Sequence, residues 1–312
     1  MVGVTEYYTA DMLPDVLPAA VRNDQIWHYT SSAGVLGLLS TGGLWVSSAR
    51  SLNDSGEIDY GNEVLMNRWD AQKAQYAHRD LMDELLEVGY EARQQDLFVA
   101  CASTVGDSLS QFRAYGSYAV GLNAGVPLRP VRDRIDEDHF GFSSPSDLSA
   151  DMSTRNGWRP VLYDTDRQLA LVDRFLSYLD DRCNTWPRNG QSDDPTDGEA
   201  FARDIAASQF VAVAAHLKHP AFADEHEVRL FVQMSLANPA VKIRDGRLGL
   251  TPYFAVEPDP GPGNEPQFAT MLTGARIGPG LADPEAAREG LDMALSKFGL
   301  RFSVETLQIP FR

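Results

Sequence analysis

The chain alternates between short apolar runs and amphipathic stretches along most of its length. Short apolar runs, or apolar residues at every second position, predict strands, and apolar residues at spacings of three and four predict helices. The predicted strands lie at 25–31, 44–49, 96–104, 118–123, 159–163, 225–234, 271–280 (strand and turn) and 302–311. The predicted helices lie at 32–41, 53–93, 107–116, 166–183, 199–216 and 282–299.

Local signals mark the ends of two of these helices. Gly42-Gly43 ends the first helix, because glycine adopts the left-handed backbone that closes a helix. Near the C-terminus, Asp283 is a predicted N-cap, Pro284 occupies the first helical position, and Gly299 ends the helix.

Strands and helices are interleaved, but several strands are short and close together, and no glycine-rich fingerprint follows the first strand. This pattern favours an α+β fold with an antiparallel or mixed sheet over a doubly wound nucleotide fold. Residues 1–24 are predicted to be an N-terminal extension, and 25–312 a single domain. Turn-forming residues predict mobile loops near 184–199 and 256–267.

Composition narrows the class of protein. The 312 residues are 43% hydrophobic and 10% aromatic, enough to bury a core and to exclude a disordered chain. A formal charge of −17 disfavours non-specific binding to nucleic acid or anionic membrane, although a local basic groove stays open. Two cysteines, no signal peptide and no long apolar run predict a protein of the reducing cytoplasm with no membrane partner.

The segment FADEHEVRLF, 222–231, contains five ionisable side chains. Strand alternation from Glu225 places Glu225, Glu227 and Arg229 on one face. Two carboxylates one step apart repel each other and cost free energy to desolvate. With one guanidinium they predict a net negative patch, the kind that stabilises a cationic transition state. An ion pair between Arg229 and Glu227 is the structural alternative.

Two further segments carry candidate residues. In WHYTS, His28 and Thr30 share one face of the first strand and Tyr29 lies on the other. A histidine flanked by aromatic residues is also a common core residue, so structural and functional roles stay open.

In FVACAST, Ser103 and Thr104 end an apolar strand, and Arg113 and Tyr115 follow on the next helix. No nucleophile elbow surrounds Ser103, and Cys101 is predicted to be inert inside its strand.

His216, His219 and His226 lie close together near acidic residues, which are residue types that can bind zinc. Their spacing matches no helical HExxH motif, so we predict no metal.

The ordered motifs WHYTS, GGLWVSSARSLNDSGE, FVACAST, FRAYGSYAVGL, FADEHEVRLF, ARIGPG and IPFR resemble the bacterial family known as "domain of unknown function 2971". The resemblance covers about residues 25–312, and the family's name implies no activity.

A looser resemblance is to ADP-ribosyltransferases, which implies a split pair of antiparallel or mixed sheets, flanked by helices, that grips NAD. His28 matches that fold's first-strand position, with Tyr29 and Thr30 beside it, and the Ser103-Thr104 pair resembles its middle motif. Glu225-His226-Glu227 resembles the E-x-E element, which implies a catalytic Glu227 and a Glu225 that engages the acceptor.

The resemblance leaves two further roles to be assigned. Tyr115 is an alternative aromatic for stacking nicotinamide, and Arg50, Arg113 and Arg229 are candidates for gripping the NAD diphosphate. The chain departs from the family by combining a first-strand histidine with a Ser-Thr middle motif.

The resemblance therefore implies an NAD-consuming ADP-ribosyltransferase of toxin or phage-defence type, with NAD as its substrate. The acceptor stays open between protein, nucleic acid, small molecule and water, and an antitoxin or defence-system partner is implied. The alternatives are a non-catalytic interaction or sensor module of a defence system, and an NAD glycohydrolase or other hydrolase that uses Glu225, Glu227 and His28.

Overall fold

The structure of the protein is a computed structural model. The residues that it describes are 16–22, 24–51, 56–92, 97–131, 157–184, 195–234, 236, 238, 240–246, 249–261, 264 and 267–308. The predicted turn at 53–54, residues 185–194 of the first predicted loop, and most of the N-terminal extension lie outside these ranges.

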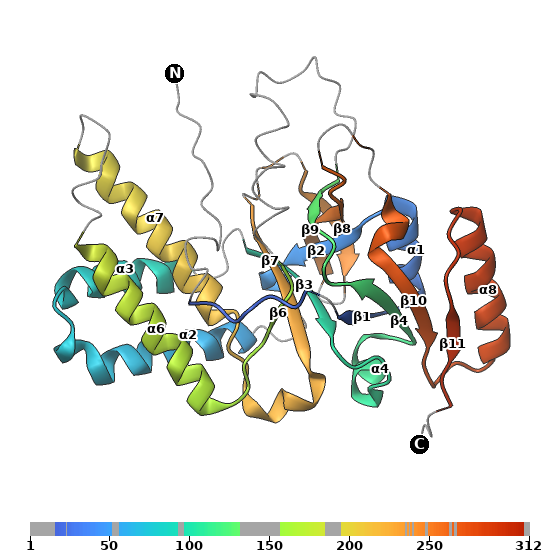
Figure 1. Cartoon of the computed structure of the whole chain (residues 1–312), viewed down its shortest axis with the longest axis horizontal. Coiled ribbons are helices and arrows are strands. Elements are labelled where there is room, and N and C mark those ends of the chain that lie inside the picture. Colours follow the sequence, from blue (N-terminus) through green and yellow to red (C-terminus); the bar gives the residue numbers. More distant parts are fainter. Residues whose placement is uncertain are drawn as a thin grey trace, which may run out of the picture.

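Eleven described strands form one hydrogen-bonded sheet (Figure 1). Their bounds are β1 Gln25–Thr30, β2 Leu44–Ser48, β3 Leu97–Ser103, β4 Tyr118–Asn123, β5 Leu128–Pro130, β6 Arg159–Pro160, β7 Glu227–Gln233, β8 Lys242–Gly246, β9 Gly249–Pro258, β10 Leu272–Ile277 and β11 Val304–Thr306. The mixed α+β class is as predicted, but the implied split into two separate sheets is not present among the described strands.

The α-helices also follow the predicted order. Their bounds are α1 Ser32–Thr41, α2 Gly56–Gln72, α3 Arg79–Ala92, α4 Leu109–Tyr115, α6 Thr165–Cys183, α7 Pro195–Ala214 and α8 Pro284–Lys297. The single helical region predicted at 53–93 is two helices, because the 3-10 turn Lys73–Gln75 separates α2 from α3. None of the helices described is long and apolar enough to cross a lipid bilayer.

Helices cover the sheet from both sides. The long helices α2, α3, α6 and α7 gather at one side, and α8 lies at the opposite end of the view (Figure 1). One buried cluster joins those four helices to Val99 and Phe231 of the sheet. A second cluster packs α1 and α8 against the other face, through residues such as Ile26, Ala100 and Leu230.

The join between β1 and β3 is narrow. β7 pairs with β3 along its whole length, from Leu97 to Ser103. On the other edge, β1 pairs with β3 at Ser103 and β2 pairs with it at Phe98 and Val99. Between these points, the stretch Ala100–Ala102 of β3 pairs with no other described strand on this edge. We call this stretch the sheet gap.

The described part of the predicted extension is anchored to the domain. Val16 and Leu17 are buried in the helical core cluster, and the Val21 N–H donates to the Trp158 carbonyl at 2.7 Å. The two predicted loops are shorter than expected within the described ranges. Residues 195–199 belong to α7, and 256–258 belong to β9, where Val256 pairs with Leu44.

Candidate functional site

The chain enters β7 through a left-handed turn. Pro220–Glu225 forms a 3-10 helix, and His226 follows with a φ of 47°, a region uncommon for residues other than glycine. The prediction that Glu225 and Glu227 alternate along one strand is therefore wrong, because the backbone turns between them. Glu227 and Arg229 do lie on one face of β7.

Four charged side chains meet at this turn, and we call them the ion cluster: Lys218, Glu225, Glu227 and Arg229. The Lys218 Nζ donates to Glu225 Oε2 at 2.5 Å and to Glu227 Oε2 at 2.8 Å. Arg229 donates through Nε to Glu227 Oε1 at 2.6 Å and through Nη2 to Oε2 at 2.9 Å. Each Glu227 oxygen thus accepts from at least one cation.

The ion cluster is electrically balanced, with two carboxylates facing two cations. This corrects the predicted net negative patch, because Lys218 supplies the second positive charge. Burial alone would raise the pKa of Glu227, but the charges of Arg229 and Lys218 outweigh it and hold that pKa well below its usual range. Glu227 therefore stays ionised, although its side chain is 8% exposed.

Three uncharged side chains surround the ion cluster. The Cys101 thiol hydrogen-bonds to the Glu227 carboxylate, and the Tyr163 hydroxyl accepts the Glu227 backbone N–H at 3.1 Å. Tyr115 also faces the cluster. Burial first, and then nearby negative charge, raise the pKa values of Tyr115 and Tyr163, so both phenols stay protonated.

His28 lies at the sheet gap. Its Nδ1 is 2.8 Å from the Cys101 carbonyl oxygen, and a carbonyl can only accept, so Nδ1 carries the proton. Burial lowers the pKa of His28, and the positive charge of Arg244 lowers it further. The imidazole is therefore neutral, and Nε2 is an acceptor. Cys101 thus links the two predicted residues, with His28 at its carbonyl and Glu227 at its thiol.

The middle-motif residues hold the turn in place. Ser103 is buried, and its hydroxyl donates to the Glu225 carbonyl at 2.7 Å. The Thr104 backbone N–H donates to the His226 carbonyl at 3.0 Å, while the Thr104 side chain is exposed. Both residues therefore contact the turn through its backbone, and they fix where Glu225 lies.

The remaining predicted residues take separate positions. The Tyr29 hydroxyl donates to the Val105 carbonyl at 2.7 Å, and burial raises its pKa to about 12. Thr30 is half-buried at the end of β1, and Arg113 is exposed on α4. Arg229 is 1% exposed and neutralises Glu227, which is the structural alternative that the sequence left open.

His216, His219 and His226 lie in three different environments. His216 is buried, with Nδ1 2.6 Å from the Ala212 carbonyl oxygen. His219 caps the 3-10 helix through the Ala221 N–H, and His226 is exposed. Within the described ranges, no group of three or more histidine, cysteine or acidic side chains is placed to hold a metal ion.

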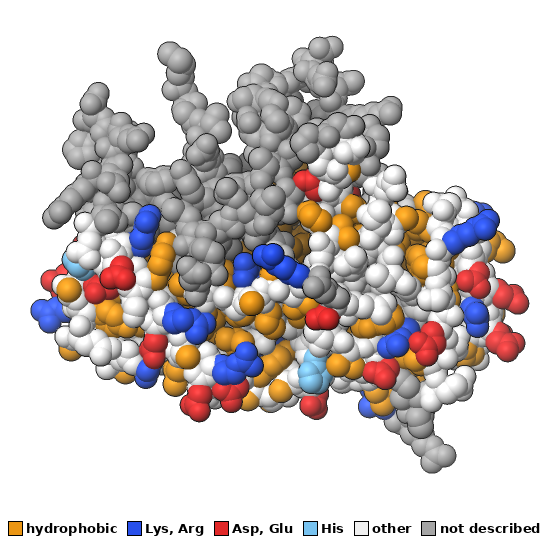
Figure 2. Space-filling model, in the orientation of Figure 1, with side chains coloured by type: hydrophobic (Ala, Val, Ile, Leu, Met, Phe, Trp, Pro, Cys, Tyr) orange, Lys and Arg blue, Asp and Glu red, His pale blue; other side chains and the backbone are white. Residues whose placement is uncertain are grey.

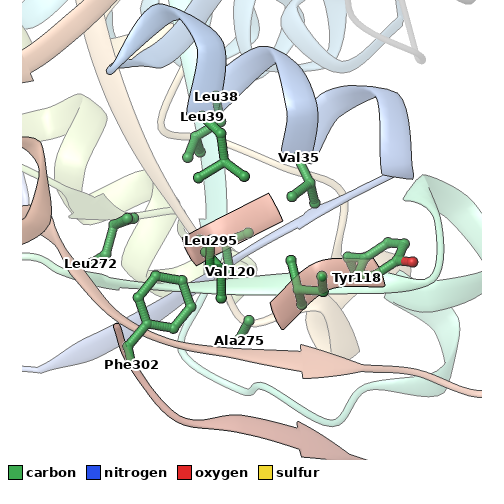
Figure 3. Close-up of a pocket in the computed structure, with 10 residues that line it drawn as sticks. Val35, Leu38, Leu39, Tyr118, Val120, Leu272, Ala275, Leu295 and Phe302 are labelled. Atoms are coloured by element: carbon green, nitrogen blue, oxygen red, sulfur yellow. The ribbon is translucent and has the colours of Figure 1, made fainter. Parts of the chain in front are cut away.

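Two cavities lie away from the ion cluster. The first is enclosed by apolar side chains of α1, β4, β10 and α8, including Val35, Val120 and Leu295 (Figure 3). Its volume of about 10 Å³ corresponds to one water molecule, so it is a packing defect. The second is an open polar depression of about 600 Å³ between α2 and α6, beside Tyr76 and Asp180.

Sequence reasoning missed Lys218, Tyr163 and Arg244. The chain has four lysines, and Lys218 lies between two histidines seven residues before Glu225. The small number of lysines and the position of Lys218 close before Glu225 were the sequence signals that could have identified it. No comparable signal marks Tyr163, which follows the short strand β6 that pairs with β7, or Arg244, which lies on β8.

Comparison with known proteins adds no relative: no protein-family model, no curated protein and no solved structure matches the chain.

Proposed function

We propose that the chain is an NAD-dependent ADP-ribosyltransferase-like enzyme whose reaction centre is the ion cluster beside the sheet gap. One observation carries the proposal: Glu227 and His28, far apart in sequence, contact the same residue, Cys101. Both side chains thus lie beside the sheet gap, His28 from β1 at the Cys101 carbonyl and Glu227 from β7 at the Cys101 thiol.

The state of Glu227 suits the chemistry of breaking the nicotinamide–ribose bond. NAD carries a positive charge on the nicotinamide ring, and this charge moves to the ribose as the bond breaks. A permanently ionised carboxylate stabilises that oxocarbenium-like sugar. Glu225, whose side chain is 18% exposed, is the carboxylate that we assign to the incoming acceptor.

His28 supplies the complementary contact. Its neutral imidazole keeps Nε2 as a hydrogen-bond acceptor, which suits a ribose hydroxyl. An imidazolium would instead repel the cationic sugar, so the lowered pKa of His28 favours this role.

The described strands form one sheet, and its narrow join between β1 and β3 is the feature that favours the finer fold assignment. The single pair Trp27–Ser103 joins β1, β4, β10 and β11 to the remaining strands. A narrow join of this kind is compatible with the split sheet of ADP-ribosyltransferases, and the dispersed motifs support membership of the "domain of unknown function 2971" family. Cys101 and Cys183 form no disulfide, in keeping with a cytoplasmic protein.

Glu227 is also the basis of a second candidate function. Both of its oxygens accept from buried cations, so the ion cluster can be a structural device inside a non-catalytic interaction module of a defence system. On that hypothesis the protein neither binds nor cleaves NAD.

The test is nicotinamide release from NAD by the purified protein, compared between wild type, Glu227→Gln and Glu257→Gln. Glu257 is the matched control, because it is a mostly buried glutamate paired with Arg129 at 3.0 Å. We expect Glu227→Gln to lower the rate by about 10² to 10³-fold, the usual effect of removing one electrostatic stabiliser. Glu257→Gln should keep the wild-type rate.

The products identify the acceptor class. Free ADP-ribose indicates water as acceptor, and a modified macromolecule or small molecule indicates transfer. Unchanged release by a folded Glu227→Gln variant would end the assignment of Glu227. If the wild type neither binds nor cleaves NAD, the interaction module is the better hypothesis.

A further inference from the structure

Arg244 faces the same side of the sheet as the ion cluster. Directly paired residues of antiparallel strands share a face, as do alternate residues of one strand. The pairs Arg244–Thr251, Tyr253–Ser47, Ser47–Val99 and Cys101–Arg229 connect β8 to β7 through β9, β2 and β3. Arg244 and Glu227 therefore point to one side.

The Arg244 guanidinium is held by a hydroxyl and two aromatic rings. Its Nη2 donates to Ser47 Oγ at 2.9 Å, and its Nη1 donates to the Asp245 carbonyl at 3.1 Å. The guanidinium carbon lies 5.2 Å from the Trp45 ring centroid and 5.9 Å from that of Tyr253. These contacts fix its orientation before any ligand arrives.

Arg244 differs from other arginines of the sheet in its charge balance. Arg129, Arg229 and Arg276 each form an ion pair with a glutamate. Within the described ranges, no carboxylate lies at ion-pair distance from Arg244. It is half-buried, and burial lowers its pKa. The Asp245 carboxylate acts on Arg244 only from beyond ion-pair distance. An oriented, half-buried cation that forms no ion pair favours an anionic ligand.

Donors remain available for such a ligand. Each Nη carries two hydrogens, and one on each is used in the contacts described. Ser47 accepts from Arg244, so its own O–H can donate to a further acceptor. Two N–H groups in a planar fork beside one O–H match the oxygens of a phosphate.

We propose that Arg244, Ser47, Trp45 and Tyr253 form a phosphate-binding subsite for the diphosphate of a dinucleotide. The identity of this ligand rests on the proposed function. Ser47 pairs with Val99, the residue of β3 next to the unpaired stretch Ala100–Ala102, so the subsite adjoins the sheet gap. Trp45, the second residue of β2, lies on the same face of the strand as Ser47. The arginines predicted for this role, Arg50, Arg113 and Arg229, are not needed for it.

The probe is inorganic pyrophosphate, measured by calorimetry with the full chain at low ionic strength. Loss of a charge-assisted phosphate contact in Arg244→Gln should weaken pyrophosphate binding about tenfold or more. Arg276→Gln is the matched control, because Arg276 also stacks on a tryptophan, 4.2 Å from the Trp27 ring centroid, but pairs with Glu305. It should change binding less than about twofold. Arg244→Lys, which keeps the charge but loses the fork, should fall between wild type and Arg244→Gln.

The outcomes separate the subsite from the proposed function. Pyrophosphate binding that depends on Arg244, without nicotinamide release from NAD, supports the subsite and contradicts the proposed enzyme activity. If Arg244→Gln releases nicotinamide with an unchanged KM for NAD, the subsite is contradicted and the proposed enzyme activity is still supported. The subsite is also overturned if wild type does not bind pyrophosphate, or if Arg276→Gln weakens binding as much as Arg244→Gln.

Discussion

Two histidines are held neutral inside the protein, and their protonation links folding to pH. Burial lowers the pKa of His216 from 6.5 to about 3, and it also lowers that of His28. A buried neutral histidine contributes stability that is fully present above its unfolded pKa. That contribution is lost as the pH falls from about 6.5 toward the folded pKa, because the unfolded chain takes up the proton.

His216→Leu tests this link. Leucine has a similar volume and removes Nε2, a buried atom without a hydrogen-bond partner among the described residues. Between pH 7.5 and pH 5.0, the free energy of unfolding should fall by about 2 kcal/mol less in the variant than in wild type. Urea unfolding at the two pH values measures this.

The control is His226→Asn, which changes an exposed histidine to a residue that tolerates left-handed backbone. It should keep the wild-type pH dependence. An equal loss of stability in His216→Leu and wild type would contradict the assigned role of His216.

At this scale the sequence predicts partners within one strand better than partners across the fold. The pairing of Arg229 with Glu227 followed from their spacing along β7. Lys218 could not be assigned from spacing, because the 3-10 helix and the left-handed turn bring its amine back onto Glu225.

Close contact between α2 and α7 depends on Gly61. A Cβ built on Gly61 of α2 would lie 2.1 Å from the Ala214 carbonyl oxygen of α7. Backbone cannot move aside as a flexible side chain can, so Gly61→Ala should force the two helices apart and destabilise the protein by about 1–3 kcal/mol. Thermal and urea unfolding measure the change.

Gly290→Ala is the matched control in α8. A Cβ there meets no atom within 4 Å, so the variant should gain about 0.5–1 kcal/mol from better helix propensity. Destabilisation by both substitutions, or by neither, would contradict the packing argument.

Elements with strong local signals were predicted well, and those that depend on neighbours were not. Asp283 caps α8 through the Ala286 N–H, and Gly299 has a φ of 69°, both as predicted. The strands β8 and β9 were not predicted, because their polar and apolar residues lack a clear period. They are stabilised by pairing with each other and by the pairing of β9 with β2. The strand predicted at 159–163 shrinks to Arg159–Pro160.

At the scale of the whole molecule, charge is dispersed over the face that Figure 2 shows. Basic and acidic side chains alternate over the face shown in Figure 2, without a continuous basic stripe. With a formal charge of −17, this favours a local cation such as Arg244 over a broad field as the means of attracting an anion.

The order of the strands was beyond sequence reasoning. Local pattern predicted β1, β2 and β3, but not that β1 and β2 meet the same edge of β3 at opposite ends. Pairings between distant segments depend on the whole set of competing contacts. The sheet gap, where His28 contacts the Cys101 carbonyl, results from these pairings between distant strands.

Because Lys218 is buried, chemical labelling of lysines can report on the folded state of the protein. The chain has four lysines: Lys73, Lys242 and Lys297 reach solvent, whereas Lys218 is 1% exposed. An amine-reactive ester should label three lysines in the native protein and all four in urea, as mass spectrometry of peptides can measure. Rapid labelling of Lys218 in the native protein would contradict its burial. If Lys218 is protected from labelling, its amine reports whether the turn before β7 is closed.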